Sequence, residues 1–503
     1  MSISFNNIPN TTRSPGVYAE VDASRALQGL AQNPHKALII GQMIDTGSAA
    51  YETLYAITSE ILADSYFETG SILSRMCRKF KENNPNTELY ALALNSGDGT
   101  IASGAIFFSI LMSVALEVVS TSDETVFLMI NGTQIQQALT LTWSVGEVNS
   151  AFVDAINANS ALPVSANTNA TSALVLEAKC SGTFGNFIDV RFNYYTGQSM
   201  PTCFNVSGAS AIIEPMAGGS ADPDIDAAWA VIENEQYQYI IHGYVDTTNL
   251  TALETEMARR FKPLVDQAGI GFGGARVVLA SATALGNSRN SPHNCIIAAN
   301  DSPTAPEEWA AAYGAVAAFN LNNDPARPLH FLPLTGVLAP PTESRFTRTE
   351  REILLYDGIA TWLTDSAATV LIERCITTYQ KNALGTPDAT YLDVQTLATL
   401  EEIRYQYKAR MENRFLIPRF KLADDTFLVQ PGTYVATPKT IKSEIISLFA
   451  LLRDNAIIEN LDDFITNLIV ERNTTDKNRV DVLLPPDLIN QFRILAGLVQ
   501  FIL

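Results

Sequence analysis

The sequence predicts a multidomain protein: an α/β core with a parallel-type sheet, a mainly-β insertion that forms an outer β domain, and an α+β C-terminal domain with extended terminal arms. Three observations support this. Strands alternate with helices on both sides of residues 97–210. That segment itself shows little helical periodicity, and the chain end is apolar. We therefore predict an arm at 1–28, a discontinuous α/β domain at 29–96 and 211–340, an insertion domain at 97–210, and a C-terminal core domain at 341–503.

The first elements follow from local signals. Asn, Thr, Pro and Ser dominate residues 1–28, where Pro9 and Pro15 oppose a helix, so we expect an extended arm. Short apolar runs at 37–41 and 89–94 predict buried strands. Between them, residues 69–83 carry an apolar stripe at helical spacing, which predicts an amphipathic helix.

The insertion is predicted from alternating apolar and polar residues. Strands are expected at 126–130, 138–143, 174–178 and 188–194, and helix only as a turn or two near 150–158. Asn131 and Gly132 favour a hairpin turn. Residues 99–116 are uncharged over the length of a membrane-spanning helix. Their β-branched content and acidic flanks favour buried strands, so no membrane insertion is expected.

The α/β pattern resumes after Pro223. Helices are predicted at 224–234, 248–268 and 305–319, and strands at 237–245, 276–280 and 295–299. The run from Gly269 to Gly274 fits the pattern GxGxxG, but a helix precedes it and a strand follows it. Dinucleotide binding requires the opposite order. We therefore interpret these glycines as a helix cap and a tight turn, and predict no nucleotide cofactor.

The C-terminal part has mixed signals. We predict a helix at 347–356, a hairpin of 359–363 with 369–377, a helix at 392–414, further helix within 441–471, and strands at 427–429, 481–484 and 492–503. The last of these strands is apolar on both faces. Because such a strand would aggregate if left uncovered, it must join a sheet of its own chain or of a neighbouring copy.

Charge is distributed unevenly along the chain. The formal net charge is −20, from 53 acidic and 33 basic residues. Residues 85–250 hold sixteen acidic residues and only two basic ones, whereas residues 343–421 hold eleven of each. Nucleic-acid binding needs a basic surface, so the acidic segment argues against nucleic acid as a partner.

No group of residues matches a catalytic or metal site. The five cysteines are scattered and form no CxxC pair, as expected for reduced thiols of a protein made in the cytoplasm. His293 and Cys295 lack further metal ligands. Asp222, Asp224 and Asp226 lack the glycine and glutamate of a calcium loop, so we interpret them as acids at a helix N-terminus. We predict no enzyme, no metal and no cofactor.

A basic cluster occupies the last two turns of the helix predicted at 392–414. It consists of Arg404, Lys408, Arg410 and Arg414. Cations at a helix C-terminus complement the helix dipole, and nearby glutamates can pair with them. The alternative is that the cluster meets an acidic surface of a partner protein, and the sequence leaves both interpretations open.

Several strings together resemble the contractile tail sheath proteins of Mu-like phages. They are SPGVY at 14–18, GNFIDVR at 185–191, ITTYQ at 376–380 and DVLLPPDLINQFR at 481–493. The likeness runs from about Ser4 to the C-terminus. None of the strings is a catalytic signature, so the resemblance depends on their order and spacing.

The resemblance implies a structural, force-generating role in the virion. Sheath subunits, assembled in the host cytoplasm, stack as hexameric rings in a helical tube around the tail tube protein. Baseplate and tail terminator proteins are further partners, and contraction drives the tube through the host envelope. The acidic insertion would face outward, and the basic cluster (Arg404, Lys408, Arg410 and Arg414) would face the tail tube.

The resemblance also implies strand exchange between subunits, in which terminal arms add strands to a sheet of another copy. Strand addition needs free, apolar ends. The candidate residues are Ile3, Phe5, Ile8, Phe492, Ile494, Leu495, Leu498, Val499 and Phe501.

Two alternatives stay open at this point. One is a cytoplasmic α/β enzyme with a β lid, suggested by the strand–helix alternation and the glycine run. The other is the sheath of a bacteriocin-like contractile device, which the sequence does not separate from a phage tail.

Overall fold

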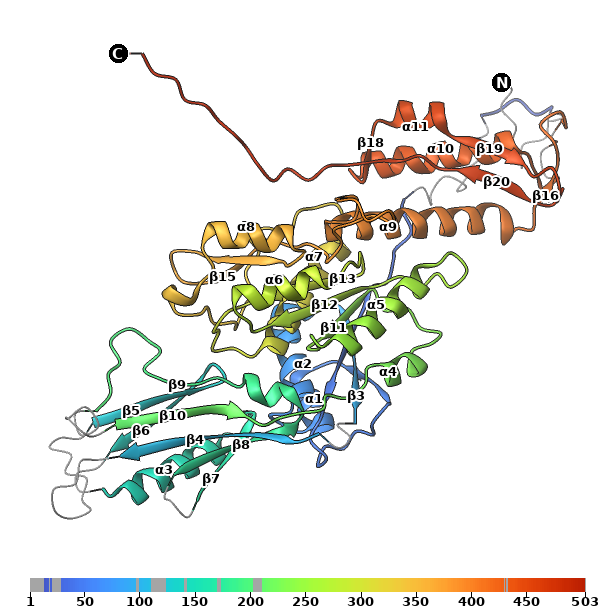
Figure 1. Cartoon of the computed structure of the whole chain (residues 1–503). Helices are drawn as coiled ribbons and strands as arrows, with labels where there is room; N and C mark the ends of the chain where they lie inside the picture. The colour runs from blue at the N-terminus through green and yellow to red at the C-terminus, as the bar shows by residue number, and fades with distance from the viewer. Residues whose placement is uncertain are drawn as a thin grey trace. The chain divides into compact units, whose positions relative to one another are not determined.

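The computed structural model describes residues 13–17, 19, 29–95, 99–109, 124–139, 143–169, 173–201, 210–428, 430 and 433–502. The chain is drawn in Figure 1 and splits into two compact units. The larger unit combines Pro34–Glu401 with Asn490–Leu503, and the smaller one combines Met1–Asn33 with Glu402–Ile489. The mixed α/β character is confirmed, and the division into four domains stays a prediction. Among the described residues, every helix is too short or too polar to traverse a bilayer.

A six-stranded sheet with the order β13-β12-β11-β1-β3-β2 lies in the larger unit. Its strands are β1 (Lys36–Gln42), β2 (Leu54–Ile57), β3 (Glu88–Leu94), β11 (Tyr239–His242), β12 (Ile270–Ala275) and β13 (Asn294–Ala298). All neighbours are parallel except β2, which runs antiparallel to β3 at the edge. Because β1 pairs with β11, the segments before and after the insertion share one sheet, as the alternation predicted.

Helices connect these strands. They are α1 (Glu60–Phe67), α2 (Ile72–Asn83), α4 (Asp226–Val231), α5 (Thr247–Phe261), α6 (Leu279–Asn287) and α7 (Pro306–Asn323). Helix α1 was not predicted, although Ser59 caps it by accepting a hydrogen bond from the backbone N–H of Leu62. Helix α7 is buried along most of its length, because it packs against β11, β12 and α2.

The glycine run forms a strand, so the predicted cap and turn were wrong. Gly271, Gly273 and Gly274 lie within β12, which begins directly after Gly269, and the strand predicted at 276–280 is absent there. A Cβ atom on Gly274 would lie 2.1 Å from the carbonyl oxygen of Pro306. A Cβ atom on Gly314 of α7 would lie 2.7 Å from Cγ1 of Ile241. Helix α7 therefore packs directly on strand backbone at Gly274, and the Ile241 side chain packs on helix backbone at Gly314; both close approaches require the glycines.

The insertion, together with residues 211–217 of β10, contains two antiparallel sheets. The first has the order β10-β4-β8-β7 and the second the order β6-β5-β9. The strands are β4 (Ile101–Ser109), β5 (Glu124–Ile130), β6 (Thr133–Leu139), β7 (Val164–Thr168), β8 (Leu174–Ser181), β9 (Val190–Phe192) and β10 (Ser210–Ala217). A separate hydrophobic core lies between them, in which the rings of Phe108 and Phe152 stack 5.6 Å apart.

Two details of the insertion differ from the prediction. Helix α3 (Val145–Ala158) exceeds the expected turn or two, because Ser144 and Glu147 form a capping box that starts it early. Of the strand predicted at 138–143, residues 138–139 belong to β6, which begins at Thr133; residues 140–142 lie outside the described residues, and Trp143 is not in a strand. The predicted turn is confirmed: Asn131 and Gly132 have φ angles of 46° and 75° between β5 and β6.

The larger unit continues with α8 (Arg348–Tyr356) and the hairpin of β14 (Thr361–Thr364) and β15 (Val370–Arg374), as predicted. Helix α9 (Val394–Met411) follows and continues into the smaller unit, where one π-helical turn extends it over Glu412–Leu416.

The smaller unit packs α10 (Pro438–Asp454) and α11 (Leu461–Asn467) around a core in which the rings of Phe449 and Phe464 stack 3.9 Å apart. Its strand pairs are β16 (Lys421–Leu422) with β17 (Val435–Ala436), β18 (Ile458–Glu459) with β21 (Asp487–Leu488), and β19 (Ile469–Arg472) with β20 (Val480–Leu483). The helix predicted within 441–471 is interrupted by β18. The strand predicted at 427–429 is absent at 427–428, and residue 429 lies outside the described residues.

Candidate functional site

The C-terminal arm, defined here as residues 490–502, is the first candidate for assembly. None of these residues belongs to a strand, and Figure 1 draws the arm as an extended trace. The strand-exchange candidates Phe492, Ile494, Leu495, Leu498, Val499 and Phe501 are each 72–89 % exposed. Such a run of exposed apolar side chains marks an interaction site or an aggregation site. The N-terminal candidates Ile3, Phe5 and Ile8 lie outside the described residues.

The β19–β20 hairpin presents two open edges, because within the described residues each strand pairs only with the other. Val470 and Val482 pair across the hairpin and pack against the core of the smaller unit. Ile469 and Leu483, the adjacent pair, are 50 % and 56 % exposed. An added strand would find a partly buried apolar layer on one face of this hairpin and an exposed apolar pair on the other.

The four basic candidates lie near the C-terminal end of α9, and two of them are paired within the smaller unit. Nε of Arg410 donates to Oε1 of Glu444 at 2.6 Å, and Arg414 lies 3.5 Å from the other oxygen of that carboxylate. Lys408 is exposed and Arg404 is half-buried. The structure therefore neutralises Arg410 and Arg414 in part, and Lys408 and Arg414 are the two exposed cations of the four candidates.

A buried ion cluster joins the insertion to two helices. Nη2 of Arg75 in α2 lies 2.7 Å from Oε1 of Glu307, and its Nη1 donates to Glu308; both glutamates begin α7. Glu308 also accepts a 2.7 Å hydrogen bond from the amide of Asn131 in the β5–β6 turn. The Asn131 carbonyl oxygen accepts from the backbone N–H of Ala305 at 3.0 Å. Burial raises the pKa of Glu307, and Arg75 opposes this shift.

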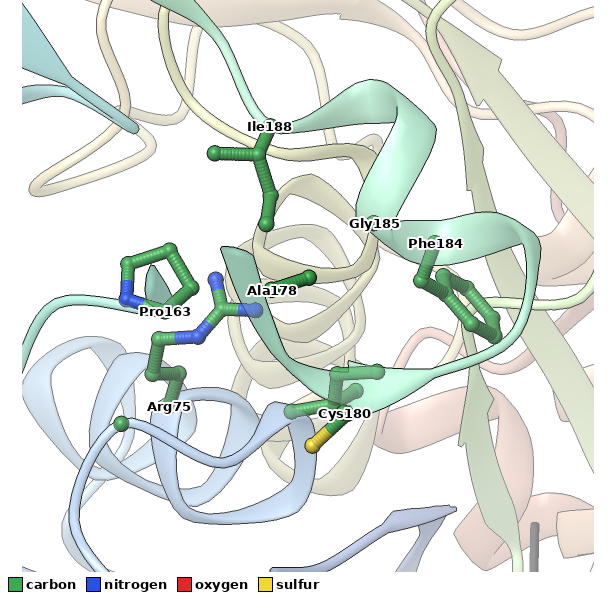
Figure 2. Close-up of a pocket in the computed structure, with 9 residues that line it drawn as sticks. Arg75, Pro163, Ala178, Cys180, Phe184, Gly185 and Ile188 are labelled. Atoms are coloured by element: carbon green, nitrogen blue, oxygen red, sulfur yellow. The ribbon is translucent and has the colours of Figure 1, made fainter. Parts of the chain in front are cut away.

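The surroundings of Arg75 are closely packed. Figure 2 shows its guanidinium group among Pro163, Ala178 and Ile188, with Cys180 and Phe184 nearby. The hollow that these residues line is ≈ 10 Å³, about enough for one water molecule. On this side the cluster is therefore a closely packed structural joint, whereas on another side Arg75, Asn131 and Glu308 line an open hollow of ≈ 400 Å³.

A second ion cluster involves the string at 185–191. Asp189 accepts from both Arg191 and Arg276, and Arg191 also lies 3.0 Å from Oδ1 of Asp301. Arg276 and Asp301 follow β12 and β13, so the cluster ties the insertion to the core sheet. Asn186 adds a clamp, because its side chain donates to and accepts from the backbone of Gly219 at 2.8 and 2.9 Å.

Sequence reasoning did not single out Arg75, Glu307 or Glu308. The available signal was an arginine inside the apolar stripe of a helix, which is rare without a buried partner. The glutamates were not identifiable as that partner, because Glu307 and Glu308 follow Pro306 and look like ordinary acids of a first helical turn.

The residues weighed for catalysis have structural surroundings. His242 and His293 are buried, and burial lowers the pKa of each to about 4. Asp222 accepts a hydrogen bond from the backbone N–H of Thr183 at 2.6 Å, and burial raises the pKa of Asp222.

Within the described part of the chain, no group of three or more His, Cys, Asp or Glu residues could hold a metal ion. Cys77, Cys180, Cys295 and Cys375 are buried free thiols, and Cys203 lies outside the described residues.

Comparison with known proteins places this arrangement in a family. Residues 218–378 match the phage tail sheath protein central domain, and residues 386–502 match the phage tail sheath C-terminal domain. The chain is 36 % identical over 504 residues to the Mu-like prophage FluMu tail sheath protein of Haemophilus influenzae, with 100 % of both chains covered. The chain belongs to the phage tail sheath protein family. The sheath assignment makes it a structural subunit of a Mu-like contractile tail, and the enzyme alternative is excluded.

Solved sheath structures are similar at low sequence identity. The sheath tail protein of Desulfitobacterium hafniense has a TM-score of 0.47 at 12 % identity, with 94 % of this chain and 100 % of that chain covered. The helical sheath of the anti-feeding prophage in its contracted state has a TM-score of 0.46 at 11 % identity, with 98 % and 99 % covered.

Proposed function

We propose that this sheath protein polymerises as stacked hexameric rings around the tail tube, held together by strands exchanged between subunits. Contraction of the assembly then drives the tube through the host envelope. The observation that supports exchange most directly is the C-terminal arm, which belongs to no strand and whose six apolar candidate side chains are exposed. In this proposal the subunits assemble in the host cytoplasm, and baseplate and tail terminator proteins bind the ends of the stack.

The β19–β20 hairpin is the acceptor that fits this arm. Main-chain hydrogen bonds along an open edge supply affinity, and alternate side chains supply specificity. One face of the arm would continue the partly buried Val470–Val482 layer, and the other would cover Ile469 and Leu483. This accounts for an arm that is apolar on both of its faces. A contact between identical subunits that does not close on itself generates an open helical array.

Negative-stain electron microscopy of the purified full chain tests the assembly itself. We expect tubes of constant width at high subunit concentration, because the arm of each copy meets an open edge on the next. Tubes joined to capsids in particles from lysed cells would identify a phage tail, and tubes without capsids would identify a bacteriocin-like device. A protein that stays monomeric at every concentration, even with tail tube and baseplate proteins present, would contradict the proposal.

The basic candidates are proposed to face an acidic tail tube. The double change Arg404→Glu and Lys408→Glu is expected to weaken co-sedimentation with purified tail tube by about tenfold, since exposed charges contribute about 0.2–1 kcal/mol each and reversal adds repulsion. The melting temperature of the subunit should stay unchanged. A matched control, Lys439→Glu with Arg453→Glu, makes the same charge change on α10. Wild-type tube binding by the α9 variant would remove this part of the proposal.

A further inference from the structure

The root of the C-terminal arm is held on the larger unit by ion pairs. Nη1 of Arg493 lies 2.5 Å from Oδ2 of Asp393, which is 100 positions earlier in the chain. Nη2 of Arg374, at the end of β15, lies 3.3 Å from the other oxygen of Asp393. The side chains of Arg493, Asp393 and Arg374 are 22 %, 15 % and 32 % exposed, so the cluster is partly shielded from solvent.

Asp393 is itself held by its backbone surroundings. The backbone N–H of Thr377 donates to the carbonyl oxygen of Leu392 at 2.8 Å, and Ile376 forms a β-bridge with Asp393. Helix α9 begins directly after Asp393, where a carboxylate is favoured by the helix dipole. The string at 376–380, which contributed to the family resemblance, therefore fixes the position of the carboxylate that receives Arg493.

The apolar side chains of the arm that follow Arg493 are exposed to solvent. Ile494, Leu495, Leu498 and Val499 are 84–89 % exposed. A Cβ atom on Gly497 would have no neighbour within 4 Å. Among the described residues up to 502, Arg493 is the last that makes an ion pair with the rest of its unit. The boundary between the held and the free part of the chain thus falls at one arginine.

We propose that Arg493 is a positioning residue that fixes where the C-terminal arm leaves its own subunit, so that only residues 494–503 search for a neighbouring copy. This inference rests on the strand exchange proposed above and adds to it a residue that sets the exit point of the arm. Its partner is Asp393 of the same chain, and the pair persists in the assembled sheath.

The physical effect is on the effective concentration of the arm at the acceptor edge. The ten residues after the anchor reach at most about 35 Å when fully extended. Without the anchor, the free segment would begin after β21, which ends at Leu488, and would contain fifteen residues. Lengthening a tether in this way lowers the effective concentration about twofold, and losing the fixed exit direction lowers it further.

The first test is Arg493→Gln. We expect polymerisation at equal subunit concentration, followed by light scattering, to slow by about two- to tenfold. The melting temperature of the subunit should not change, because Arg374 still neutralises Asp393. Asp393→Asn keeps the shape of the partner and should give the same slowing. Arg453→Gln is the matched control, since it removes an exposed ion pair with Asp454 and should leave the rate unchanged. A wild-type rate for Arg493→Gln overturns the inference.

A second test asks whether the root stays on its own subunit during assembly. Arg493→Cys and Asp393→Cys are combined and bridged within one chain by a short bismaleimide, and mass spectrometry confirms the intramolecular link. The cross-linked subunit is expected to form tubes at the wild-type rate or faster. Failure of the cross-linked subunit to form tubes, while the unlinked double variant forms them, would show that the root must detach and would overturn the inference.

Strand exchange by the arm and the anchor at Arg493 are contradicted by different results. If deletion of residues 492–503 leaves tube formation intact, strand exchange by this arm is wrong. If that deletion blocks tube formation but the Arg493 and Asp393 variants match the wild type in rate, strand exchange stands and the anchor is wrong.

Discussion

Deletion of residues 492–503 is expected to abolish tube formation and to leave a soluble subunit. The deleted segment contributes no strand to either unit, so the described elements keep their partners. Its six candidate side chains are 72–89 % exposed in the single chain and become buried only if another copy receives them. Full burial of such side chains contributes about 1.5–3 kcal/mol each, so the deletion removes most of the free energy of the contact. Sedimentation and negative-stain microscopy measure the loss.

A finer version of this experiment replaces single side chains on the two faces of the arm. Leu498→Asp and Val499→Asp should each shift assembly to higher subunit concentration, because both faces are covered in the proposed exchange. Ile61→Asp is the control, since Ile61 is also apolar and 81 % exposed but lies in α1. Normal tubes from the deletion variant, in yield and width, would rule out exchange of this arm.

Replacement of Arg75 by Met is expected to destabilise the larger unit by about 3–5 kcal/mol, because it leaves the carboxylates of Glu307 and Glu308 buried without their cation. The side chains of Arg75, Glu307 and Glu308 are 8 %, 0 % and 10 % exposed, so water cannot replace the lost partner. The Asn131 amide still donates to Glu308, but it carries no charge. Urea unfolding followed by circular dichroism at pH 7.5 measures the effect.

The destabilisation should depend on pH. Burial raises the pKa of Glu307 in the folded protein, so the folded state favours the protonated acid. Stability from that protonation is fully present below the ordinary glutamate pKa of 4.5 and is lost as the pH rises through the raised value. The loss of stability caused by Arg75→Met should therefore be largest at pH 7.5 and shrink toward pH 4.5.

Arg78→Met is the control on the same helix, α2. It breaks a more exposed pair with Asp64 and should cost less than about 1 kcal/mol. Equal losses for both variants would contradict the role of the buried cluster.

Much of the fold was predictable because its signals are local. The apolar runs around β1 and β3, the stripe of α2 and the Asn131–Gly132 turn each depend on a few neighbouring residues. Strand β12 was missed for the same reason, because its glycines look like turn residues until α7 is placed against them. That helix begins more than thirty positions later in the chain, so no local window contains both partners.

The candidate site was predictable only in part. The arm stood out because apolar residues on both faces of a terminal strand have no local explanation. The anchor of the arm was not predictable, because Arg493 and Asp393 are 100 positions apart and each looks like an ordinary surface charge. The same holds for Arg75 and Glu307, which are 232 positions apart. Pairs that are so far apart in the sequence depend on the topology of the fold, and the periodicity of apolar residues does not predict that topology.

The direct packing of α7 on the glycines of β12 has a mechanical consequence. At Gly274 the backbone of α7 meets the backbone of β12, and at Gly314 the side chain of Ile241 meets the backbone of α7, so this layer has little free volume to compress. Under the load of a contraction stroke such a layer behaves as a stiff plate and transmits force without storing it. In the proposed strand exchange, the displacement of the stroke would then fall on the segments that join subunits, among them the described residues 494–502.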